Sequence, residues 1–113
     1  MPLPLPPAPI FAALGDETRL ALLHRLQHGD QPLSSLAEGL GMSRQAVTKH
    51  LDVLERAGLV VGERRGRQHL YRLRPAGLRA VADWVDQYRR SWEETLDRLG
   101  DYLQTLPPKD TPP

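Results

Sequence analysis

The sequence predicts a mainly α-helical domain with one small β-hairpin, in the order helix, helix, helix, helix, hairpin, helix. Apolar residues recur every three or four positions in segments separated by glycines, which is typical of amphipathic helices. Two short segments rich in β-forming residues flank a run of glycine and arginine, which predicts the hairpin. A chain of 113 residues has room for one such domain.

The proline-rich ends mark the limits of the domain. Residues 1–9 hold five of the 11 prolines and residues 107–113 hold four, and proline interrupts the hydrogen-bond ladder of a helix. We therefore expect disordered tails at 1–9 and 107–113, and a folded domain at 10–106.

Two helices begin the domain. Residues 10–14 are expected to form a short apolar helix that ends at Gly15, and Asp16 is placed to cap the next helix. The second helix is expected to reach Gly29, with an apolar side formed by Leu20, Leu23 and Leu26.

A glycine turn separates the third helix from the fourth. Leu33 is expected in a very short strand, and Ser34 or Ser35 is expected to cap the third helix. Gly41 ends that helix and Met42 is expected to be buried in the turn, while the apolar side consists of Leu36, Ala37 and Leu40.

The fourth helix completes a helix-turn-helix pattern with the third. Ser43 caps it, and it is expected to run to about Ala57 and to be closed by Gly58. At helical spacing its inner side consists of Val47, Leu51 and Leu54, and its outer side of Arg44, Gln45, Thr48, Lys49 and Asp52. These outer side chains suit base edges and phosphates, and Arg44 and Gln45 lie in the first turn, which in a recognition helix enters the major groove. An ordinary amphipathic helix with a polar outer side is the alternative.

A basic hairpin follows the helix-turn-helix. Its strands are expected at 59–61 and 69–73, and the tip between them carries Arg64, Arg65 and Arg67. Arginine suits phosphates and narrow minor grooves, and the neighbouring glycines let the tip approach another backbone closely. Together the two motifs predict a winged helix-turn-helix that binds double-stranded DNA; a surface hairpin with solubilising arginines is the alternative.

The net charge of +1 hides an uneven distribution of charge. Residues 43–74 hold eight basic and three acidic residues, a net charge of +5, and the rest of the chain carries −4. A positive segment in a nearly neutral protein favours a polyanionic partner over a solvated charge run.

Four blocks of sequence resemble the arsenic-repressor (ArsR-type) winged helix-turn-helix regulators: AALGDETRL at 12–20, SRQAVTKHL at 43–51, LERAGLV at 54–60 and GRQHLYRL at 66–73. The resemblance covers about residues 10–103 and implies a dimeric repressor, often of its own operon, that binds palindromic operators. By position it assigns DNA contacts in the recognition helix to Ser43, Arg44, Gln45, Thr48, Lys49 and His50, and in the wing to Arg64, Arg65 and Arg67. His50 lies beside the buried side of its helix, so packing at that boundary and contact with a phosphate are both open.

The sequence departs from the metal-sensing members of this family. It has no cysteine, and Ser34, Ser35, Leu36 and Ala37 occupy the region of the expected cysteine pair. The last helix has carboxylates but no histidine, so the familiar acid-plus-histidine site is missing as well. His24 and His28 are spaced four residues apart but lack a third ligand nearby. We expect a metal-free branch of the family, with no metal and no cofactor.

The last helix, expected at about 75–104, carries an apolar seam wider than the domain can cover alone. The seam consists of Leu78, Val81, Val85, Tyr88, Trp92, Thr95, Leu99, Tyr102 and Leu106, with Trp84, Leu96 and Leu103 alongside. A second copy of the chain is the expected cover, with help from Phe11 of the first helix, which predicts a homodimer. A small apolar effector bound among the aromatic residues is the alternative.

Other classes of function fit the sequence less well. No apolar stretch approaches the roughly 18 residues of a membrane span, and the first residues lack the features of a signal peptide, so we expect a cytoplasmic protein with no membrane partner. No catalytic constellation or phosphate-cradling loop can be assembled, so we expect no enzyme. A winged-helix protein-interaction module without specific DNA binding is the remaining alternative, and the basic wing argues against it.

Overall fold

Five helices and three short strands make up residues 8–108, the part of the chain that the computed structural model describes. The mainly helical winged helix-turn-helix architecture is as predicted, including a very short strand before the third helix. The elements are α1 (Ala8–Leu14), α2 (Glu17–Leu26), β1 (Gln31–Pro32), α3 (Leu33–Ala37), α4 (Arg44–Arg56), β2 (Val60–Arg65), β3 (Gln68–Leu73) and α5 (Pro75–Thr105).

The expected tails lie mostly outside the described residues, which leave out 1–7 and 109–113. Helix α1 begins at Ala8, two residues earlier than expected, so Pro9 lies in its first turn. Proline is tolerated there because the first amides of a helix have no partner within the helix.

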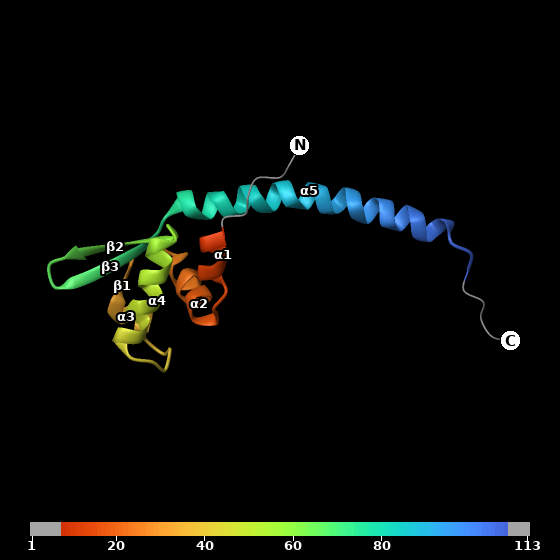
Figure 1. The fold of residues 1–113 in the computed structure, drawn as a ribbon. Coiled ribbons are helices and arrows are strands. Elements are labelled where there is room, and N and C mark those ends of the chain that lie inside the picture. Colours follow the sequence, from red (N-terminus) through yellow and green to blue (C-terminus); the bar gives the residue numbers. More distant parts are fainter. Residues whose placement is uncertain (1–7, 109–113) are drawn as a thin grey trace.

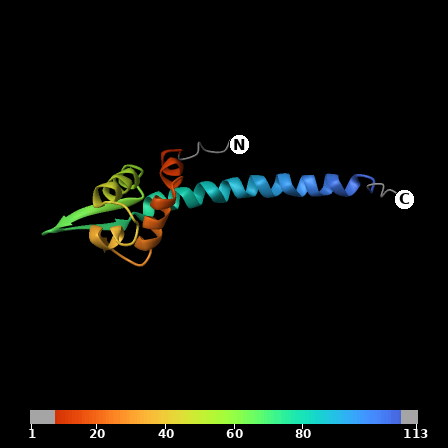
Figure 2. The same ribbon diagram turned by 90° about the horizontal axis from the view of Figure 1, so that it is seen from below.

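The three strands form one antiparallel sheet in the order β1-β3-β2. β2 and β3 form the wing, whose register closes with Arg65 opposite Gln68, so the loop consists of Gly66 and Arg67 alone. Gly66 has a φ of +61°, which glycine adopts without steric cost, and this permits the tight connection. The wing points away from the domain on one side and α5 projects on the other (Figures 1 and 2).

The core lies where α2, α3 and α4 meet the base of the sheet. Its fully buried residues include the predicted inner side of α4, and they are Ala13, Leu22, Leu26, Leu36, Val47, Leu51, Leu54, Leu59, Val60 and Tyr71. The apolar side of α2 is rotated from the prediction: Leu22 and Leu26 are buried, whereas Leu20 is 50% exposed.

Local capping explains two of the helix starts. The Asp16 carboxylate accepts a hydrogen bond from the Arg19 N–H at 3.1 Å, and the Ser43 hydroxyl accepts one from the Ala46 N–H at 3.1 Å. These are the N-caps predicted for α2 and α4. Gly58, with a φ of +79°, follows α4 as predicted.

The region before α4 departs from the prediction in four details. The strand lies at Gln31–Pro32 rather than at Leu33, because these residues pair with Tyr71 and Leu70 of β3. Pairing fixes Pro32 in an extended conformation, so Pro32 takes the N-cap position and both Ser34 and Ser35 lie inside α3. α3 ends at Ala37, before Leu40, and Met42 is half-buried rather than buried.

Candidate nucleic-acid interface

The outward side of α4 presents most of the residues assigned to the recognition helix. Arg44, Gln45 and Lys49 are exposed, whereas the Ser43 hydroxyl is occupied as the N-cap. The Thr48 hydroxyl donates to the Arg44 carbonyl oxygen at 2.8 Å, which leaves it able to accept a hydrogen bond from a ligand.

His50 lies at the boundary between α4 and the start of α2, as one of its two expected roles requires. Its Nδ1 is 3.2 Å from the Arg19 guanidinium and 3.7 Å from the Asp16 carboxylate. The hydrogen bond from the Arg19 N–H, together with the charges of His50 and Arg19, lowers the pKa of Asp16. The Arg19 guanidinium also donates to the carbonyl oxygens of Ala12 and Ala13 at the end of α1. These contacts hold α4 against α1 and α2.

The wing carries its three arginines on the surface. Arg64 and Arg65 lie on β2 and Arg67 lies in the loop, and all three are exposed. Glu63 is 3.6 Å from Arg65 and 3.8 Å from Arg72, so it partly neutralises this pair. Arg64 and Arg67 form no ion pair within residues 8–108, and their charges are available to a polyanion.

A hydrogen bond fixes the wing relative to α4. The Gly62 N–H in β2 donates to the Glu55 carboxylate on the last turn of α4 at 2.8 Å. The stacked rings of His69 and Tyr71 lie so close to Gly62 that a Cβ there would be 2.8 Å from the Tyr71 ring. Glu55 was not predictable as a positioning residue, because only the folded chain brings this exposed carboxylate next to β2.

Helix α5 leaves most of its apolar seam uncovered. No residue of α5 is buried, and Trp92 and Tyr102 are 54% and 59% exposed. Phe11 of α1 packs edge-on against Trp84 with ring centroids 5.0 Å apart, and Trp84 stacks on Tyr88. Phe11 therefore joins α1 to the start of the seam within one chain, and its expected part in a dimer stays a prediction. The C-terminal half of α5 runs free of the domain (Figure 1). None of the described helices combines the length and apolar character needed to cross a lipid bilayer.

Comparison with known proteins places these features in a family. A family model described as a helix-turn-helix domain matches residues 14–63. The HTH-type transcriptional regulator Rv2034 of Mycobacterium tuberculosis is 40% identical over 86 residues, which cover 76% of this chain and 78% of that protein. The structure of an ArsR-like transcriptional regulator from Rhodococcus sp. RHA1 superposes with a TM-score of 0.71 and 38% identity, covering 88% of this chain and 94% of the other. The chain belongs to the ArsR-type winged helix-turn-helix transcriptional regulators.

A third comparison concerns assembly. The homodimeric winged helix-turn-helix DNA-binding domain of a possible ArsR-family regulator from Mycobacterium bovis superposes with a TM-score of 0.58 and 26% identity. The match covers 80% of this chain and 82% of that domain.

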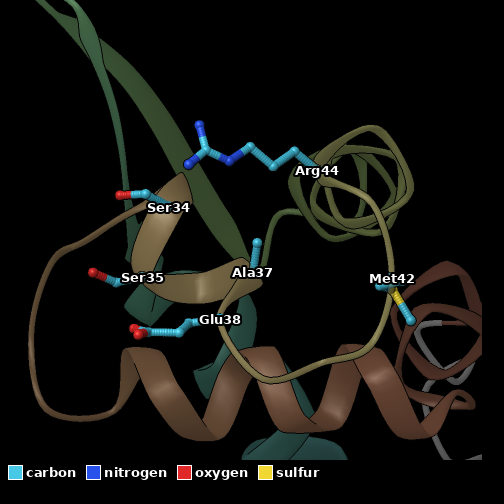
Figure 3. Close-up of a pocket in the computed structure, with 6 residues that line it drawn as sticks. All are labelled: Ser34, Ser35, Ala37, Glu38, Met42 and Arg44. Carbon is cyan, nitrogen blue, oxygen red and sulfur yellow. The ribbon is translucent and has the colours of Figure 1, made fainter.

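In this ArsR-type regulator a groove separates α3 from the start of α4 (Figure 3). The groove has a volume of about 510 Å³ and is lined by Ser34, Ser35, Ala37, Glu38, Met42 and Arg44. It is called the α3–α4 groove below.

The histidine pair of α2 lines a second pocket, together with Ser35 and Leu36 of α3. The rings of His24 and His28 meet edge-on with centroids 6.4 Å apart. Within the described part of the chain, no group of three or more histidine, cysteine, aspartate or glutamate side chains is arranged to hold a metal ion.

Proposed function

We propose that the chain is a homodimeric repressor whose α4 enters the major groove of operator DNA while the wing contacts the flanking duplex. One observation carries this proposal: α4 and the wing together expose a set of cations that the protein does not neutralise. Arg44, Lys49, Arg64 and Arg67 have no acidic partner within residues 8–108. Uncompensated arginine and lysine on one surface are the footprint of a phosphate backbone.

Specificity in this proposal belongs to α4. Gln45 is exposed in the first turn, and an amide side chain can form two hydrogen bonds with an adenine edge. The Ser43 hydroxyl accepts from the Ala46 N–H but can still donate its own proton, so Ser43, Thr48 and Lys49 complete the recognition surface. His50 is held by Arg19 and Asp16, so its role is to orient α4 rather than to bind DNA.

The proposed dimer forms through α5 and α1. The exposed seam from Val85 to Leu106 is apolar, and apolar surface of this extent favours association. The homodimeric state of the Mycobacterium bovis domain supports a dimer. A dimer presents two α4 helices, which suits an operator with two half-sites.

We further propose that this regulator belongs to a metal-free branch of its family. The chain has no cysteine, so α3 offers no thiolate, and α5 offers no histidine. Adding Zn²⁺ or arsenite is therefore expected to leave the affinity for DNA unchanged. A metal-dependent loss of DNA binding would contradict this part of the proposal.

The test uses a duplex selected by the purified protein from a random-sequence library, compared with a scrambled duplex of the same composition. Fluorescence anisotropy is expected to show tighter binding to the selected duplex. Gln45→Ala should reduce this preference by about 1–3 kcal/mol per lost base contact, with little effect on the scrambled duplex. The exposed Gln87→Ala on α5 is the matched control and should change neither affinity. Failure to enrich any sequence would contradict the proposal and favour a protein-interaction module.

A further inference from the structure

The side of the α3–α4 groove formed by Ser34 and Arg44 has the chemistry of an anion site. Arg44 begins α4, yet its side chain extends across the groove toward Ser34 of α3 (Figure 3). Within the described residues, neither the Arg44 guanidinium nor the Ser34 hydroxyl has a hydrogen-bond or ion-pair partner, and both residues are exposed. Two unsatisfied donor groups from different helices therefore face the same space.

We infer that Arg44 and Ser34 together bind one phosphate of the DNA backbone, so that Arg44 positions the duplex and does not read a base. This inference rests on the proposed function, because it names the part of DNA that one of the proposed contact residues binds. It decides between base edges and phosphates, the two kinds of contact that the sequence leaves open for Arg44.

The shape of the donors favours a phosphate. The guanidinium is a planar fork that matches two phosphate oxygens, and a serine hydroxyl can donate to a third oxygen. In helix-turn-helix proteins the first helix of the motif crosses the DNA backbone while the second enters the groove. The junction between α3 and α4 is therefore where a backbone phosphate passes.

Glu38 limits the site to one end of the α3–α4 groove. Its carboxylate lies on the far side of Ser35 from the Arg44 guanidinium (Figure 3), so it does not neutralise Arg44. Its negative charge repels an anion from its own end of the groove. Because Arg44 attracts an anion and Glu38 repels it, the phosphate is expected at the Ser34 end of the α3–α4 groove.

Separate variants distinguish a phosphate contact from a base contact. Arg44→Ala is expected to weaken binding to the selected and the scrambled duplex by the same factor, about tenfold, and to reduce the salt slope by about 1 for each protomer. Ser34→Ala is expected to act in the same direction with a smaller factor. Arg44→Lys keeps the charge without the fork and should fall between wild type and Arg44→Ala. Gln87→Ala on α5 is the control and should match wild type.

Duplexes in which one phosphate at a time is replaced by an uncharged methylphosphonate identify the partner. Wild type is expected to bind more weakly when one particular phosphate in each half-site is replaced. Arg44→Ala should bind that modified duplex and the unmodified duplex with the same affinity. If Arg44→Ala removes only the preference for the selected duplex, or stays sensitive to every methylphosphonate that wild type senses, the inference is wrong. If wild type binds neither duplex, the proposed function itself fails.

Discussion

Gly77→Ala is expected to displace α5 from the domain, because Gly77 is where the helix backbone touches the turn between α4 and β2. A Cβ at this position would overlap the Gly58 carbonyl oxygen and lie 2.8 Å from its carbonyl carbon and 3.4 Å from the Leu59 Cα. These atoms belong to backbone, which cannot rotate out of the way as a flexible side chain can. The helix must therefore move away from the turn, and the contacts of Leu78 and Trp84 with the domain weaken.

Whether Gly77→Ala raises or lowers the free energy of unfolding depends on two opposing contributions. Alanine favours a helix over glycine by up to about 1 kcal/mol. Overpacking a close contact costs about 1–3 kcal/mol, and the upper part of that range applies because backbone must shift. We therefore expect a net loss of about 1–2 kcal/mol in the free energy of unfolding, which lowers Tm by about 5–15 °C for a domain of this size.

The assay is thermal unfolding followed by circular dichroism at a fixed protomer concentration, since the Tm of a dimer depends on concentration. Gly100→Ala is the matched control: it lies in the same helix, with no atom within 4 Å of its Cβ position, and it should raise the stability slightly. If Gly77→Ala is as stable as Gly100→Ala, α5 does not pack on this turn as described.

Three further perturbations test other parts of the structure. Glu55→Ala removes the acceptor for the Gly62 N–H and should lower the free energy of unfolding in urea by about 1 kcal/mol. Glu55→Gln keeps an oxygen acceptor and should lower it by less. Equal losses of stability in the two variants would mean that this hydrogen bond does not hold the wing. Burial and the nearby carboxylates of Asp52 and Glu55 raise the pKa of Tyr71. The folded protein therefore holds the phenol proton more tightly than the unfolded chain does. Ionisation of Tyr71 lowers the free energy of unfolding only as pH rises above about 10, the pKa of a free tyrosine. Tyr71→Phe should therefore lose less of its stability between neutral pH and strong alkali than wild type, and an equal loss would exclude this cause. Trp92→Glu should convert a dimer to a monomer in sedimentation velocity, whereas Gln87→Glu on the opposite side of α5 should not; a dimer that survives Trp92→Glu would exclude the seam as the interface.

Local chemistry made much of the fold predictable from the sequence. The caps at Asp16 and Ser43 involve residues three positions apart, and the glycine that closes α4 acts through its own backbone. The inner side of α4 was predictable because helical periodicity alone identifies Val47, Leu51 and Leu54.

Features that depend on long-range contacts were not predictable. The pairing of Gln31 and Pro32 with β3 moved the strand and the start of α3, and nothing near these residues in sequence signals it. The packing partners of α2 decide that Leu22 is buried and that Leu20 is exposed.

The same limit applies to the candidate site. Its arginines and glutamine were found from their place on α4 and the wing, because their outward position follows from helical and hairpin geometry. The contact of His50 with Arg19, the bond from Gly62 to Glu55 and the orientation of Arg44 toward Ser34 each join residues from separate elements. They became visible only in the folded chain.

The salt dependence of DNA binding tests the central claim most directly. The four cations assigned to the DNA contact, Arg44, Lys49, Arg64 and Arg67, give eight in a dimer, so a plot of the logarithm of the binding constant against the logarithm of salt concentration should have a slope of about −7. Between about 50 and 200 mM KCl, the affinity of wild type for the selected duplex should fall by about four orders of magnitude. A slope close to zero, or the same slope after Lys49, Arg64 and Arg67 are all replaced by alanine, would show that this surface does not bind DNA.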